Sequence, residues 1–172
     1  LPIKDKGTYI FIADVTGHGV PAGMIASVTH STLYCFTQVF SKTDEIMKAM
    51  NSVIHAKSKR NMFATAMLAK WNEQSKELSY CNAGHEQIIY FDAGKQQCSL
   101  IGKGGMALGM IADLKALLKE QSLSLHPGDV LFFYTDGIPE AWKTQKENLG
   151  MERLLSMATK AARHALERAG RS

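Results

Sequence analysis

Two aspartates occupy equivalent places in the sequence, each after a short apolar run and each before a glycine-containing turn. Asp14 follows residues 9–13, and Asp136 follows residues 130–134. A single aspartate at the end of a strand commonly caps a turn, because its side chain accepts hydrogen bonds from nearby backbone N–H groups. Two such carboxylates on neighbouring strands could instead share a hard divalent cation, which prefers carboxylate, carbonyl and water oxygens. The pair therefore favours a metal site formed by Asp14 and Asp136.

The residues after Asp14 also match a dinucleotide-binding pattern. Residues 17–22 read GHGVPA, which satisfies G-x-G-x-x-A between an expected strand and an expected helix. However, the carboxylate of Asp14 would lie close to the pyrophosphate, with no lysine or arginine nearby to offset its charge. The acidic residue expected at the end of a second parallel strand is missing too, because Asp44 and Glu45 begin a helix. We therefore reject a nucleotide site.

Two histidines lie in tight turns that contain glycine. His18 is flanked by Gly17 and Gly19, where its ring could donate a proton, bind a metal or simply complete the turn. The sequence shows no second histidine at ligand spacing, which argues against zinc. His85 ends the sequence NAGH, and we interpret it as a histidine whose ring bonds the backbone and fixes a loop. No Ser-x-x-Lys, G-x-S-x-G or Cys/His arrangement indicates a covalent nucleophile.

The elements expected to position these residues are helices near both ends of the chain and strands between them. An interior helix is expected over residues 21–40, because its apolar residues lie on more than one face, and an amphipathic helix over residues 44–57. Short β-like runs then alternate with polar turns of hairpin length, as in an antiparallel meander. The expected strands cover residues 9–13, 63–69, 77–82, 87–91, 98–101 and 130–134, and a last amphipathic helix covers residues 151–166. This segregation predicts an α+β fold, with helices packed over antiparallel sheets.

Composition sets the class of protein. The 172 residues suit one domain, with 45% hydrophobic and 21% charged residues, and no apolar run approaches the length of a membrane span. The net charge of +4, without a dense basic stripe, argues against nucleic-acid binding. The three cysteines lack CxxC spacing, which favours buried thiols and a cytoplasmic setting. Because the chain starts at Leu1, we expect residues 1–172 to be a single domain truncated at both ends.

Six sequence blocks follow one another along most of the chain. They are DVTGHGVPA (14–22), FATA (63–66), NAGH (82–85), LG (108–109), PGD (127–129) and YTDG (134–137). In their order, spacing and number these blocks resemble the SpoIIE/RsbU branch of the metal-dependent protein phosphatases, the PPM or type 2C family. The resemblance extends over about residues 8–158. It implies an α/β/β/α sandwich, in which two antiparallel sheets pack face to face between helices.

The resemblance also implies a site for two Mn²⁺ or Mg²⁺ ions. Asp14 matches the carboxylate that bridges both ions, Val15 matches the residue whose backbone carbonyl binds the second ion, and Asp136 matches a ligand of the first. Gly17, His18, Gly19 and Gly137 belong to the loops expected to support this site. Two such cations lower the pKa of a bridging water and offset charge on the phosphoryl oxygens. Family members carry two further acidic motifs, Gly-Gly-Asp and a late Asp-Asp-x-Thr, which are missing from residues 1–172. We therefore expect these residues to form an incomplete metal site with impaired activity.

The function implied is that of a serine/threonine protein phosphatase. Its expected substrate is phosphoserine on an anti-anti-sigma (STAS-domain) protein, in a signalling pathway that controls sigma factor activity. An upstream sensor or regulatory domain is expected as a partner and a homodimer is left open, whereas neither nucleic acid nor a membrane is expected. The alternative hypothesis is a phosphatase-like binding module without catalysis, which the absence of Asp-Asp-x-Thr from the full-length protein would favour.

Overall fold

The computed structural model describes residues 1–3, 7–58, 62–144 and 147–169. The chain forms two compact units, each of which is assembled from two stretches of sequence. The first unit comprises Leu1–His85 and Gly102–Ser124, and the second comprises Glu86–Ile101 and Leu125–Ser172. Each unit is described by itself.

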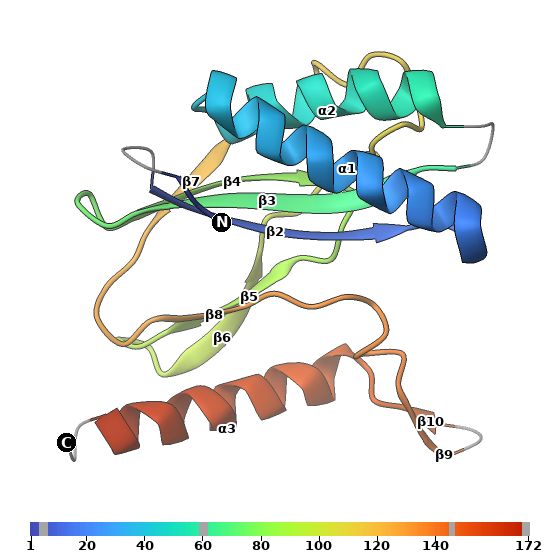
Figure 1. The fold of residues 1–172 in the computed structure, drawn as a ribbon. Coiled ribbons are helices and arrows are strands. Elements are labelled where there is room, and N and C mark those ends of the chain that lie inside the picture. Colours follow the sequence, from blue (N-terminus) through green and yellow to red (C-terminus); the bar gives the residue numbers. More distant parts are fainter. Residues whose placement is uncertain (4–6, 59–61, 145–146, 170–172) are drawn as a thin grey trace. The chain divides into compact units, whose positions relative to one another are not determined.

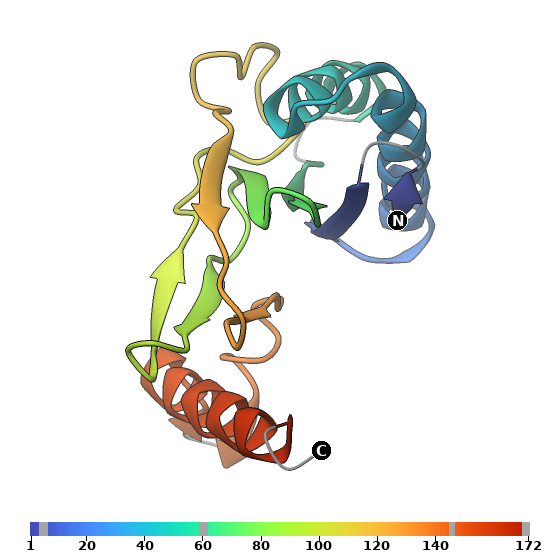
Figure 2. The same ribbon diagram turned by 90° about the vertical axis from the view of Figure 1, so that its left-hand side faces the viewer.

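The first unit is an antiparallel sheet with two helices on one face (Figures 1 and 2). The strands lie in the order β1-β2-β3-β4-β7. They are β1 (Pro2–Ile3), β2 (Gly7–Val15), β3 (Ala64–Asn72), β4 (Glu77–Ala83) and β7 (Gln121–Ser124), and the helices are α1 (Gly19–Val39) and α2 (Thr43–Lys57). The meander predicted over β3 and β4 is confirmed, because these strands pair antiparallel across the turn that follows Asn72.

The core of the first unit lies between the sheet and its helices. Alternate residues of β2 pack there with buried residues of α1 and α2; these β2 residues are Tyr9, Phe11, Ala13 and Val15. Because successive side chains of a strand point to opposite faces, Asp14 lies on the face of the sheet away from the helices. The register of β2 thus determines which side of the sheet carries the carboxylate.

The prediction of an interior helix is wrong for α1. Its buried residues form a single stripe at intervals of four: Ile25, Thr29, Leu33 and Thr37. Val20 and Met24 are 77% and 64% exposed. The apolar residues do lie on more than one face, as the sequence showed, but the unit covers only the stripe that meets the sheet and α2.

The second unit contains a three-stranded antiparallel sheet, in the order β6-β5-β8, that packs against the last helix (Figure 2). Its elements are β5 (Ile88–Asp92), β6 (Gln97–Ile101), β8 (Val130–Phe132), a hairpin of β9 (Trp142–Thr144) and β10 (Glu147–Asn148), and α3 (Met151–Ala169). Ile89, Tyr134 and Ala158 form one buried cluster of this unit, with partly buried residues of α3 around them, and Ile88, Phe91 and Ala162 are buried as well. The strand predicted over residues 130–134 is shorter in the structure, where β8 ends at Phe132.

Two antiparallel sheets carrying helices make the protein an α+β fold, as the sequence predicted. Within the ranges that the structure describes, no helix combines the length and the apolar character needed to cross a membrane.

Candidate functional site

Asp14 lies near the end of β2, directly opposite Thr65 of β3. The sequence predicted a strand that ends before Asp14. In the structure β2 continues through Val15, so Asp14 belongs to the strand. Its side chain is exposed, on the face of the sheet that the helices leave open. The backbone of Asp14 is therefore held by a β-ladder, which fixes the face of the sheet from which its side chain projects.

The backbone carbonyl of Val15 points away from β3. Val15 is paired with Ala64, but Ala64 directs both its N–H and its C=O to Leu108 on its other side, at 2.9 and 2.8 Å. In an antiparallel ladder such a pair exchanges no hydrogen bonds. The Val15 carbonyl thus faces the other side of β2, where, among the residues that the structure describes, β1 pairs with Gly7 and Thr8. An oxygen in this orientation suits a hard cation.

The turn after β2 is fastened to β3 through Thr16. Its N–H donates to the Phe63 carbonyl at 3.0 Å, and its Oγ1 contacts the Phe63 carbonyl and N–H at 3.2 and 3.1 Å. Gly17 then adopts a φ of +91°, which residues with a Cβ rarely adopt. His18 is exposed at the N-cap of α1, and among the described residues its side chain makes no capping hydrogen bond.

The second histidine, His85, lies in the loop that follows β4, a strand of the same sheet as Asp14. Its Nδ1 is 3.0 Å from the Thr65 hydroxyl, and that hydroxyl is 3.4 Å from the Asp14 carbonyl. The loop is held by Asn82: its Oδ1 accepts from the His85 N–H at 2.8 Å, and its Nδ2 donates to the carbonyls of His85 and Gly102 at 2.9 and 2.7 Å. The sequence blocks FATA and NAGH therefore meet beside Asp14. In the sequence, the only sign of this contact was the presence of the two blocks themselves.

Asp136 lies in the second unit, in a turn after β8. The turn is closed by the N–H of Ile138, which donates to the Thr135 carbonyl at 3.1 Å, and by that of Glu140, which donates to the Asp136 carbonyl at 3.0 Å. Asp136 and Gly137 are both exposed. Because Asp14 and Asp136 belong to different units, their proximity stays a prediction.

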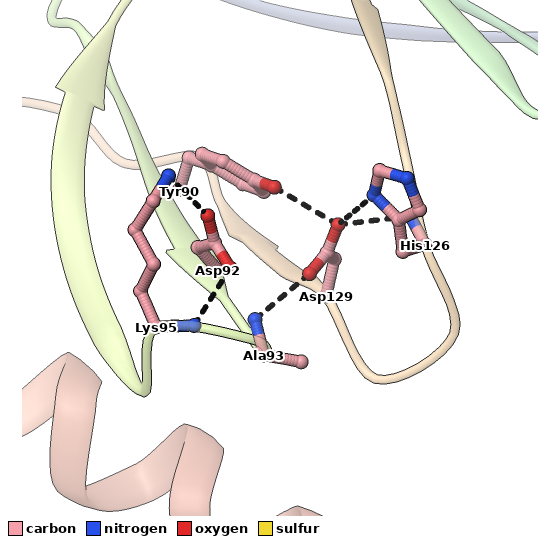
Figure 3. A network of polar contacts seen from close by, with 6 residues as sticks. All are labelled: Tyr90, Asp92, Ala93, Lys95, His126 and Asp129. Carbon is pink, nitrogen blue, oxygen red and sulfur yellow. Dashed lines mark hydrogen bonds and ion pairs between the residues drawn. The ribbon is translucent and has the colours of Figure 1, made fainter.

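A buried carboxylate in the second unit was not identified from the sequence (Figure 3). The side chain of Asp129 is 2% exposed and accepts hydrogen bonds from the Tyr90 hydroxyl (2.9 Å) and from the N–H groups of Ala93 (2.9 Å) and His126 (2.8 Å). Burial by itself would raise the pKa of Asp129, but these hydrogen bonds lower it below the usual 3.8. Burial and the carboxylate together raise the pKa of Tyr90 to about 12. The only sequence signal was the block PGD, which does not show that Asp129 is buried.

The donors at the end of β2 fit a hard divalent cation. Asp14 offers a carboxylate and Val15 a carbonyl, which are the oxygen ligands that Mg²⁺ and Mn²⁺ prefer. In the part of the chain that the structure describes, His, Cys, Asp and Glu side chains form no group of three or more that could hold a metal ion.

Comparisons with known proteins agree on one family. The sequence model of the family described as "Stage II sporulation protein E (SpoIIE)" matches residues 4–171. The phosphoserine phosphatase RsbU of Bacillus subtilis is 28% identical over 152 residues, which are 88% of this chain and 44% of that protein. The chain thus spans less than half the length of this relative.

Solved structures show the same fold. The PP2C phosphatase domain of the cell fate determinant SpoIIE from Bacillus subtilis, solved with a fragment of its regulatory domain, superposes with a TM-score of 0.71 at 21% identity. The likeness covers 90% of this chain and 42% of that one. RsbX, solved in complex with magnesium, superposes with a TM-score of 0.64 at 19% identity over 93% of this chain and 76% of that one.

Proposed function

This chain belongs to the family of the stage II sporulation protein E (SpoIIE), and from that premise we propose that it is a metal-dependent protein phosphatase acting on phosphoserine. The observation that carries the proposal is the end of β2, where the Asp14 carboxylate and the Val15 carbonyl lie in consecutive residues of one strand. The name of the relative RsbU, a phosphoserine phosphatase, supports the reaction. We take the two units to be parts of one phosphatase domain.

The proposed cofactors are two Mn²⁺ or Mg²⁺ ions, held by Asp14, Val15 and Asp136. Magnesium in the related structure of RsbX supports this choice. When bound, such ions supply a hydroxide from water near neutral pH and offset charge on the phosphoryl group. The chain's own part is to position the residues that hold them: the β2–β3 ladder sets the face of the sheet from which the Asp14 side chain projects and turns the Val15 carbonyl away from β3.

The loops beside these residues would set the shape of the site. Gly17, His18 and Gly19 connect β2 to α1, and Gly137 follows Asp136 in its turn. His18 is exposed in its loop, where its ring is accessible to a phosphoprotein, whereas the backbone of the loop is fixed through Thr16. We assign these residues to support of the site.

The proposed substrate is a phosphorylated STAS-domain protein, in signal transduction that controls sigma factor activity in the cytoplasm. An upstream sensor or regulatory domain would control the phosphatase, as the regulatory domain present in the SpoIIE structure suggests for that protein. A homodimer is a further possibility to be tested with the same protein. A binding module that has lost catalysis is the competing function.

The test is release of phosphate from a phosphorylated STAS domain by the full-length protein, with and without Mn²⁺. We expect turnover that requires Mn²⁺ and is lost in Asp14→Asn. Asp113→Asn is the matched control, since Asp113 is also an exposed aspartate of the first unit and, in the described part of the chain, accepts a local hydrogen bond from the Lys115 N–H. Binding of the phosphoprotein without turnover in the presence of Mn²⁺ would instead support the binding module.

A further inference from the structure

We infer that Thr65 and His85 form a positioning pair that holds the metal-binding end of β2 through the backbone of Asp14. Thr65 lies directly across the ladder from Asp14, and its hydroxyl lies between the Asp14 carbonyl and the His85 ring. The inference rests on the proposed function, because it concerns the same oxygen donors. Neither residue is a proposed ligand of the metal.

The contacts have a direction that follows from the chemistry of a hydroxyl. A carbonyl only accepts hydrogen bonds, and the Thr65 hydroxyl has one proton to donate. Both contacts are hydrogen bonds only if Thr65 donates to the Asp14 carbonyl and accepts from His85. In a neutral ring this arrangement requires the proton on Nδ1, so the inference includes the Nδ1–H tautomer of His85.

His85 is itself held rigidly, as a residue that positions another must be. Only 8% of the residue is exposed, and Asn82 bonds both its N–H and its carbonyl. The preceding Gly84 has a φ of +69°, and a Cβ there would lie 3.0 Å from the Ala107 nitrogen and 3.1 Å from the Gly105 carbonyl oxygen. The turn is therefore packed against backbone on its other side, and the ring has little freedom to move.

His18 provides the contrast within the same unit. It follows the Asp14 strand in sequence, yet it is exposed, and in the described residues its side chain does not cap α1. The histidine that the structure connects to Asp14 is the one that lies far from it in sequence. The pair therefore acts through β2, in the way that outer-shell hydrogen bonds orient metal ligands.

The first experiment measures Mn²⁺ affinity of the full-length protein by calorimetry. Thr65→Val keeps the shape of the side chain but removes the hydroxyl, and should weaken Mn²⁺ binding by about tenfold, at the lower end of what outer-shell changes cost. Thr65→Ser restores the hydroxyl and should bind within about threefold of the wild type, by the same reasoning. Thr29→Val is the matched control, because within the described residues the buried Thr29 hydroxyl bonds the Ile25 carbonyl of its own helix and no part of the site.

The second readout needs no metal and no activity. In protein labelled with ¹⁵N-histidine, the ring nitrogen shifts of His85, assigned through His85→Asn, should show the Nδ1–H tautomer. A ring protonated on Nε2 alone would overturn the proposed direction of the contacts.

Failure of this inference can be told apart from failure of the proposed function. If Asp14→Asn loses Mn²⁺ binding while Thr65→Val binds like the wild type, the positioning pair is refuted and the metal site stands. If Asp14→Asn itself binds like the wild type, the proposed metal site fails, and with it this inference. Circular dichroism of each variant establishes that the fold is retained, and Thr65→Ser covers the case in which Thr65→Val does not fold.

Discussion

The two candidate metal-binding aspartates are held in different ways by their units. Asp14 lies inside β2, where pairing with β3 on one side of the strand fixes the backbone before and after it. Asp136 lies beyond the end of β8, in a turn closed by local hydrogen bonds. An aspartate in a ladder keeps its backbone position as long as the sheet exists, whereas one in a turn depends on what anchors the turn.

In the described parts of the chain, the interiors of the two units differ in whether they contain a buried carboxylate. The first unit fully buries large side chains of α2 and the sheet, among them Ile46, Met50 and Leu68. The second unit also buries apolar side chains, among them Ile88 and Phe91, and in addition Asp129 joins the β5–β6 turn to the turn before β8. We conclude that both units are stabilised by apolar burial and that the second also depends on one buried carboxylate.

The largest effect is expected for the aspartates themselves. Asp14→Asn and Asp136→Asn each replace a charged ligand by a neutral one of the same shape. Each should lower Mn²⁺-dependent turnover of the full-length protein by more than about 100-fold, since even outer-shell changes at metal sites cost up to that amount. Phosphate release under saturating Mn²⁺ measures this, and near wild-type activity of either variant would refute its role as a ligand.

Removal of the Asp129 carboxylate tests the dependence of the second unit on its polar centre. Asp129→Ala leaves the donors of Tyr90, Ala93 and His126 without their acceptor, and should lower the free energy of unfolding by about 3 kcal/mol. Urea denaturation measures the loss. Asp92→Ala, which removes the neighbouring pair with Lys95, should cost much less, because Lys95 is largely exposed.

Because of the same carboxylate, we expect the stability of the folded protein to depend on pH. The pKa of Asp129 is lower in the folded protein than its usual 3.8, so its contribution to stability is fully present above that value. It is lost as the pH falls from there through the folded pKa. Urea midpoints between pH 7 and pH 2.5 should therefore fall less steeply at the acid end in Asp129→Asn than in the wild type. Equal slopes would show that Asp129 does not titrate abnormally.

Two glycines with positive φ sharpen the comparison at a smaller scale. A Cβ on Gly84 of the first unit would meet backbone atoms at 3.0 and 3.1 Å, whereas one on Gly128 of the second would meet side chains of Ala93 and Leu166, both at 3.1 Å. Both substitutions by alanine impose a conformational cost of about 1–2 kcal/mol. Gly84→Ala should cost more in thermal unfolding, because backbone yields less than side chains. A larger loss for Gly128→Ala would contradict this view of the rigid His85 turn.

The smallest expected effect is on cysteine reactivity. Burial raises the pKa of the Cys81 thiol, in the core of the first unit, to about 12, while Cys98 lies on the edge strand β6 and is only partly buried. Under native conditions Cys98 should react with iodoacetamide faster than Cys81, and exposed Cys35 faster than either. Peptide mass spectrometry over time gives the three rates. Faster labelling of Cys81 than of Cys98 would show that the first unit opens more readily.

The sequence by itself determined which segments form helices and strands, and it identified Asp14 and Asp136 as candidate metal ligands. Alternation and turn residues are local properties, so the strands of residues 77–101 could be predicted within one residue, whereas β3 extends three residues beyond its predicted end at residue 69. Local patterns also located both ends of α2, within one residue, from Asp44 to Lys57. They misplaced the ends of the strands beside Asp14 and Asp136, because a strand ends where its neighbour stops pairing, which a single strand does not show.

Only the tertiary structure decided which residues surround Asp14 and which faces are buried. The contacts of Thr65 with Asp14 and His85 join residues 51 and 20 positions apart, and Asp129 meets Tyr90 and Ala93 across 39 and 36 positions. Such contacts depend on strand register, and a shift of one residue would turn every side chain of a strand to the other face. The open second face of α1 has the same origin: its apolar pattern is local, but burial requires a neighbouring element, and the sheet and α2 cover a single stripe.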